Sequence, residues 1–114
     1  MTSKTIAVVA AFNAYKRLAA HQETANYAVQ VLRKLHQVFV RAGIPVEDDP
    51  GRMTSRGKGW IDLAQTLTYS RWRTWMDKLG FNEGPRPNSF CLPGLEGLCI
   101  KLAGDGTGIE VFVV

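Results

Sequence analysis

The side chains with the clearest chemical potential in this 114-residue chain are its cations, because 14 Lys and Arg stand against 10 Asp and Glu. Arg33, Lys34 and Arg41 fall within about 100° of one another on a helical projection. A row of cations along a helix face can follow a phosphate backbone or dock on an acidic protein surface. The same row is also common on an ordinary solvated helix.

A second group of cations, Arg52, Arg56 and Lys58, lies in a segment that Pro and Gly interrupt, residues 44–59. A connection of this length is unusual within a small domain, and such connections are often functional or mobile. We therefore predict a mobile loop. The acidic run Glu47–Asp49 in the same segment has oxygen ligands that suit Mg²⁺, but its proximity to three cations favours a self-neutralising loop.

A third group, Arg71 and Arg73, lies in a predicted helical region at residues 60–79 that ends at Gly80. Ser70 is a candidate N-cap for a second helix within it. If the region is instead a core helix, its apolar residues pack inward and the two arginines are solvated. Those apolar residues are Trp72, Trp75, Met76 and Leu79.

Part of this region resembles the first helix and turn of a helix-turn-helix, through Leu63, Ala64, Leu67, Tyr69 and Ser70. With a hairpin downstream, the order of elements is similar to that of a winged helix. The resemblance implies that Arg71, Arg73 and Lys78 lie on or near a recognition helix, with Lys101 joining them from the hairpin. The sequence departs from the family at Thr68, where Gly is preferred, and at Thr74 and Asp77, where apolar residues should pack.

The sequence predicts neither catalysis nor a metal or cofactor. Its cysteines and histidines, Cys91, Cys99, His21 and His36, lack the close pairing of zinc sites. No base is adjacent to either thiol to activate it. The glycine-rich run 104–108 joins two predicted strands, whereas phosphate-binding loops precede a helix, so we interpret the run as a turn.

No membrane partner is predicted, because the longest apolar stretch, Ile6–Ala14, is far shorter than the ~20 residues of a membrane helix. The same stretch continues into Lys16 and Arg17 without a cleavage signal. We therefore expect a cytoplasmic protein in which the two cysteines are buried thiols, although a cross-strand disulfide between them is geometrically allowed.

Two amphipathic helices are predicted at residues 4–20 and 24–42 from apolar positions spaced three and four residues apart. Gly43 follows the second helix as a stop signal. A single straight helix is disfavoured, because the apolar row of the first helix would continue through Gln22, Asn26 and Gln30. We therefore expect an antiparallel helix pair with a tight turn, or one sharply kinked helix.

The end of the sequence predicts a β-hairpin, because apolar residues alternate on both sides of the glycine-rich turn. One register places Leu102 opposite Ile109 and pairs Lys101 with Glu110 across the strands. Ser89–Leu92 is a candidate third strand, which would set Cys91 opposite Cys99.

The predicted fold is α+β in a single domain, 1–114, with a helical part 3–80, the mobile loop 44–59 and a β part 89–114. An apolar content of 46% with 21% charged residues excludes a disordered chain. Residues 1–46 carry six Lys or Arg and one Glu, whereas 89–114 carry one Lys and three carboxylates. An anionic partner is therefore expected on the helical side.

Two functions remain open. The first is a non-enzymatic module that binds nucleic acid or regulates, through the cations Arg33, Lys34, Arg41, Arg52, Arg56, Lys58, Arg71 and Arg73. The second is a small inhibitor or adaptor of phage or plasmid type, a class that includes anti-CRISPR proteins, binding a host protein complex. Size, the lack of motifs and simple architecture suit the second, which is the alternative to the first, but no residue motif identifies it.

Overall fold

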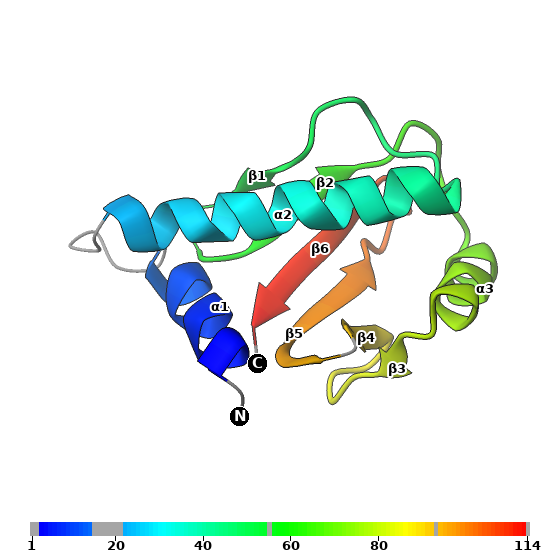
Figure 1. Cartoon of the computed structure of the whole chain (residues 1–114). Helices are drawn as coiled ribbons and strands as arrows, with labels where there is room; N and C mark the ends of the chain where they lie inside the picture. Colours follow the sequence, from blue (N-terminus) through cyan, green and yellow to red (C-terminus); the bar gives the residue numbers. More distant parts are fainter. Residues whose placement is uncertain (1–2, 15–21, 55, 93, 114) are drawn as a thin grey trace.

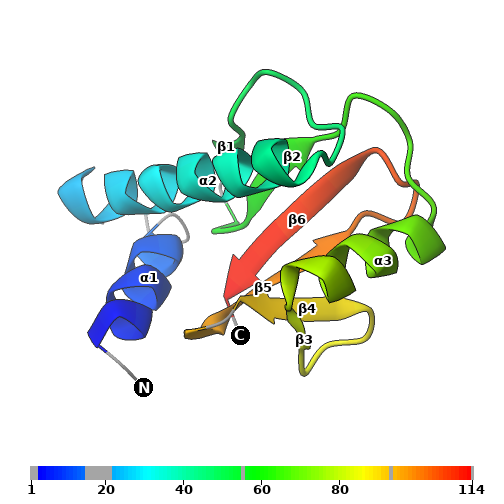
Figure 2. The same cartoon turned by 45° about the vertical axis from the view of Figure 1, so that its right-hand side comes forward.

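Among residues 3–14, 22–54, 56–92 and 94–113, which the computed structural model describes, six strands form one antiparallel sheet and three helices cover one of its faces. Figures 1 and 2 show all the helices on the same side of the sheet, with α2 lying across it. The fold class is therefore α+β, as predicted.

In chain order, the elements are α1 (Ser3–Ala14), α2 (Gln22–Ala42), β1 (Arg52–Met53), β2 (Gly59–Asp62), α3 (Tyr69–Leu79), β3 (Asn82–Glu83), β4 (Ser89–Leu92), β5 (Leu95–Leu102) and β6 (Gly108–Val113). In space, the strands follow the order β1-β2-β6-β5-β4-β3. The neighbouring strands β2 and β6 therefore join segments that are far apart in the sequence.

The core lies between the helices and the sheet. Every second residue of the central strands points into it, so that Ile61, Ile100 and Ile109 are completely buried. The α2 residue Phe39 contacts Trp72 of α3 edge-to-face, with 6.3 Å between ring centroids. One continuous apolar cluster thus joins all three helices to the sheet.

The predicted inward face of α2 is confirmed, because Ala28, Val31, Leu32, Leu35 and Phe39 are all buried. Gly43 ends the helix with φ of 88°, a left-handed conformation that Gly adopts at little cost. The N–H of Ile44 then donates to the Phe39 carbonyl at 3.0 Å. The stop signal in the sequence is therefore the physical end of the helix.

The N-terminal helices differ in arrangement from the predicted antiparallel pair. The helix predicted at 4–20 is α1, Ser3–Ala14, and residues 15–20 lie outside the described residues. The axes of α1 and α2 cross rather than run antiparallel (Figure 1). The reason is that α1 also packs on β5 and β6, where Val8 and Phe12 are buried.

The predicted hairpin is confirmed in its register: Leu102 pairs with Ile109, Ile100 with Val111, and Lys101 with Glu110. Ser89–Leu92 forms β4, and Cys91 lies opposite Cys99 as expected. The sheet is wider than the predicted three strands, however, because β2 pairs with the free edge of β6 and β3 pairs with β4.

The segment predicted as a mobile loop, 44–59, is tied to the sheet. It contains β1, forms a bridge between Val46 and Leu63, and ends in β2. The helix predicted from residue 60 is also wrong at its start, because residues 59–62 are a strand. Gly59 and Ile61 are buried while Trp60 and Asp62 are only partly buried, which is the period of two of a strand.

The structure contradicts the helix-turn-helix resemblance, because residues 64–68 form no helix before α3. α3 begins at Tyr69 and is capped by Thr68, whose Oγ1 accepts a hydrogen bond from the Arg71 N–H at 3.2 Å. The predicted cap, Ser70, lies inside the helix. Trp72 and Met76 are buried, so α3 is the core helix that was the alternative interpretation.

The cap at Thr68 gives a stability prediction. We expect Thr68→Ala to lower the free energy of unfolding by about 1 kcal/mol, because the Arg71 N–H loses its acceptor. Thr68→Ser keeps the hydroxyl and should retain wild-type stability. Urea unfolding followed by far-ultraviolet circular dichroism measures both variants, and equal loss in both would contradict the capping role.

Candidate functional site

The face of the sheet opposite the helices, here called the open face, carries a row of polar and aromatic side chains. Arg52, Trp60, Glu110, Lys101 and Ser89 are successive cross-strand partners from β1 to β4. They occupy this face because their sequence neighbours, such as Ile61 and Ile109, point into the core.

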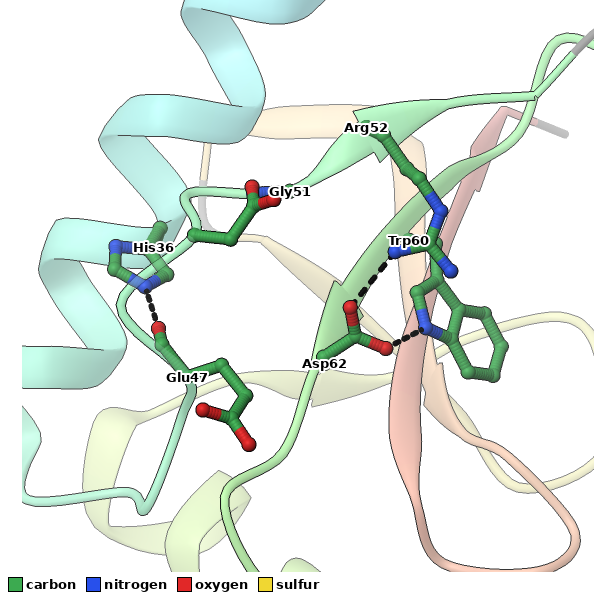
Figure 3. Close-up of polar contacts among 7 residues, drawn as sticks. His36, Glu47, Gly51, Arg52, Trp60 and Asp62 are labelled. Carbon is green, nitrogen blue, oxygen red and sulfur yellow. Dashed lines mark hydrogen bonds and ion pairs between the residues drawn. The ribbon is translucent and has the colours of Figure 1, made fainter.

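Trp60 is held on the open face by Asp62 from the same strand. The indole Nε1 donates to Asp62 Oδ1 at 2.6 Å, and Arg52 Nη1 on the adjacent strand donates to Oδ2 at 2.7 Å (Figure 3). The hydrogen bond from Trp60, and then that from Arg52, lowers the pKa of Asp62 below its usual 3.8. One oxygen of Asp62 therefore holds the Trp60 ring in place, and the other holds the Arg52 guanidinium.

The Trp60 ring lies over Gly108 of β6. A Cβ atom at position 108 would collide with three carbons of the indole, Cε2, Cζ2 and Cη2. That arrangement indicates a ring whose face rests against the sheet in the space that the glycine leaves open. The opposite face of the indole is then directed away from the sheet.

Glu110 is the direct cross-strand partner of Trp60, and its Oε1 forms an ion pair with Lys58 Nζ at 2.9 Å. Because the Trp60 ring leans toward Gly108, it does not cover the carboxylate. The Glu110 side chain is 22% exposed and that of Lys58 is 50% exposed.

Two adjoining hollows open on this face. One, of about 350 Å³, lies between Arg56, Lys58, Trp60 and Glu110. The other, of about 440 Å³, has cations at Lys58, Arg86 and Lys101 and an apolar wall made by Pro87, Phe112 and Val113. Lys58 and Glu110 line both hollows, which are within the size range of small-ligand sites.

The cysteines lie side by side on the open face, with 3.1 Å between Cys91 Sγ and Cys99 Sγ. Both are free thiols. Burial, and then the contact with Cys91, raises the pKa of Cys99 to about 12. Cys99 is therefore protonated at neutral pH, a state that is unsuited to nucleophilic attack.

The structure separates the eight predicted cations into three places. Arg33, Lys34 and Arg41 lie exposed on α2, on the helical side of the sheet. Arg52, Arg56 and Lys58 gather at the open face. On α3, Arg71 is exposed and Arg73 pairs with Glu83 of β3 at 2.7 Å, at the opposite edge of the sheet from β1.

Sequence reasoning missed Trp60, Glu110, Arg86 and Phe112 as members of a site. A usable signal was present in residues 58–62, where Lys58, Trp60 and Asp62 alternate with Gly59 and Ile61. That period of two was hidden because the strand is only four residues long and precedes a true helix.

The acidic run 47–49 serves local structure. Asp49 Oδ1 accepts a hydrogen bond from the Gly51 N–H at 2.9 Å. The carbonyl oxygen of Glu47 accepts one from His36 Nε2 at 2.6 Å (Figure 3). In the part of the chain that the structure describes, no three His, Cys, Asp or Glu side chains gather as metal ligands. No helix of that part is long and apolar enough to span a membrane.

The chain was compared with known proteins at three levels. No protein-family model, no curated protein and no solved structure matches it. The geometry of the open face is therefore the basis for any functional conclusion.

The Trp60–Asp62 contact gives a pH prediction. Because Asp62 has a lowered pKa, the contact and its contribution to stability are fully present above the unfolded-state pKa and are lost as pH falls through the lowered value. We expect the Trp60 indole N–H resonance to be constant from neutral pH to about pH 4. It should then shift with a midpoint below 3.8.

Nuclear magnetic resonance titration of the three indole resonances measures this midpoint. In Asp62→Asn the Trp60 resonance should no longer titrate, and the Trp75 resonance serves as an internal control. A Trp60 midpoint above 3.8 would contradict the assignment.

Proposed function

We propose that the protein binds single-stranded nucleic acid on the open face, without catalysis. The observation that carries the proposal is the Trp60 indole, which rests over Gly108 and is fixed by Asp62. A fixed aromatic ring offers a stacking surface to a nucleobase at little entropic cost. Bases within a duplex are already stacked and paired, so a single strand supplies the free base.

The charges around Trp60 support the same ligand. Among the side chains that the structure describes, the open face gathers five cations, Arg52, Arg56, Lys58, Arg86 and Lys101, around the carboxylates of Asp62 and Glu110. Asp62 is already occupied by Trp60 and Arg52. The remaining cations surround the two hollows, where they can neutralise the phosphates on either side of a stacked base.

This proposal moves the expected contact from the helical side to the sheet. The α2 cations lie on the helical side, away from the Trp60 ring, and Arg73 is engaged by Glu83. Of the eight cations predicted from the sequence, Arg52, Arg56 and Lys58 are the ones that lie beside the Trp60 ring and its hollow.

A second candidate function has support from α2. Val38 and Val40 are 39% and 53% exposed among its cations, and an apolar groove of about 150 Å³ runs beside Val38 and Lys34. Such a surface suits an acidic amphipathic helix of a protein partner, with apolar residues in the groove and carboxylates on the cations. The protein would then be the inhibitor or adaptor of the alternative prediction.

The stacking role gives the central prediction. We expect Trp60→Ala to weaken binding of a fluorescently labelled single strand by about 1–3 kcal/mol, which is a loss of roughly five-fold to a hundred-fold in affinity. Trp60→Phe should retain part of the affinity because the ring face is kept. Fluorescence anisotropy at fixed salt measures all three proteins.

Paired arginine variants identify the surface used. Arg56→Gln should reduce the slope of log affinity against log salt by about 0.7, the value of one phosphate contact on a single strand, whereas Arg71→Gln should leave it unchanged. A loss on Arg33→Gln/Lys34→Gln/Arg41→Gln with none on Trp60→Ala would place the ligand on α2 instead.

The second candidate function, binding of a protein partner through α2, is supported by a different result. If wild type and Trp60→Ala bind no single strand at low salt, the nucleic-acid proposal is wrong. A purified protein partner that binds wild type and Trp60→Ala but not Val38→Glu/Val40→Glu would then support the adaptor function.

A further inference from the structure

We infer that the open face prefers bases with an exocyclic amino group, and that Glu110 is the side chain that reads it. This inference rests on the proposed function and adds base selectivity to it. It begins from a carboxylate that lies among the cations of the proposed phosphate-binding surface. Glu110 lies in the middle of the cross-strand row, between Trp60 and Lys101, and lines both hollows.

A carboxylate within a phosphate-binding surface weakens binding by repulsion, so a surface that serves phosphates alone gains nothing from it. The other carboxylate of this face, Asp62, has a structural task because both its oxygens hold neighbours. Glu110 differs. Lys58 Nζ contacts its Oε1 at 2.9 Å, and one such contact leaves acceptor capacity on the carboxylate for a further donor.

The position of Glu110 suits contact with a base edge. The Trp60 ring leans toward its diagonal neighbour Gly108, so a base stacked on that ring has the direct partner of Trp60, Glu110, beside it rather than beneath it. The side chain remains 22% exposed, and Lys58 restrains its orientation. The carboxylate is thus accessible, oriented and adjacent to the stacking surface.

An ionised carboxylate only accepts hydrogen bonds. Cytosine offers an N4 amino donor at its pairing edge, and adenine and guanine offer N6 and N2 amino groups. Uracil and thymine carry the O4 carbonyl, an acceptor, where cytosine has its amino group. Their one pairing-edge donor, N3–H, lies between two carbonyl oxygens that repel the carboxylate. The expected selectivity is therefore for amino-bearing bases over uracil and thymine.

The test compares oligo(dC) with oligo(dU) of about ten nucleotides, a length within the range of single-strand sites. The two strands share backbone and ring size, and they differ at the pairing edge. We expect wild-type protein to bind oligo(dC) at least about five-fold more tightly in anisotropy titrations at the same salt, as a charged hydrogen bond to a base edge provides.

Glu110→Gln should reduce this dC-to-dU affinity ratio to near one, because an amide both donates and accepts. Glu83→Gln is the matched control, since Glu83 is a strand carboxylate with its own ion pair to Arg73 on a different edge of the sheet. It should keep the wild-type ratio. A ratio is the useful readout, because release of Lys58 would raise affinity for both strands alike.

Equal affinity of the wild-type protein for both strands, or tighter binding of oligo(dU), would overturn the inference while leaving the proposed function in place. A preference that survives in Glu110→Gln would remove Glu110 as its source. Failure of wild type to bind either strand would instead overturn the proposed function, and the base selectivity with it.

Discussion

The burial of Ile61, Ile100 and Ile109 beneath the helices fixes the direction of the neighbouring side chains on β2, β5 and β6. Successive residues of a strand point to opposite faces, and a slip of one residue would exchange the two faces completely. Trp60 and Glu110 therefore reach the open face because their neighbours are required in the core. The candidate site needs no framework of its own, since core packing sets its geometry.

The hairpin of β5 and β6 was predictable because two independent patterns agreed on one register. Apolar alternation set its core face, and the pairing of Lys101 with Glu110 satisfied the other. β2 was not predictable in the same way. Only two of its four residues pair with the nearby β1, whereas all four pair with β6, which is distant in sequence. The local pattern therefore held too little information to outweigh the helix that follows.

The candidate site was hard to predict for the same reason, because it depends on strands that are distant in the sequence. Sequence reasoning selected Arg52, Arg56 and Lys58 by charge, but it placed them in a loop and assigned the anionic partner to the helices. Their relation to Trp60 depends on β2 pairing with β6, and the role of Gly108 as the space beneath the ring depends on the same pairing. The charge of each segment could be counted from the sequence. Which of the cations lie on the same surface as the Trp60 ring depends on the pairing of the strands.

The pairing of β2 with β6 has a further consequence for how the molecule is made. α3 and the strands β3, β4 and β5 all lie between these partners in the chain, so the pair closes a long loop and adds to the non-local contacts that slow folding. Until it closes, Trp60 has no glycine to rest on and Lys58 no carboxylate to meet. A partly folded chain therefore lacks the platform, and a ligand that recognises it stabilises the completed fold alone.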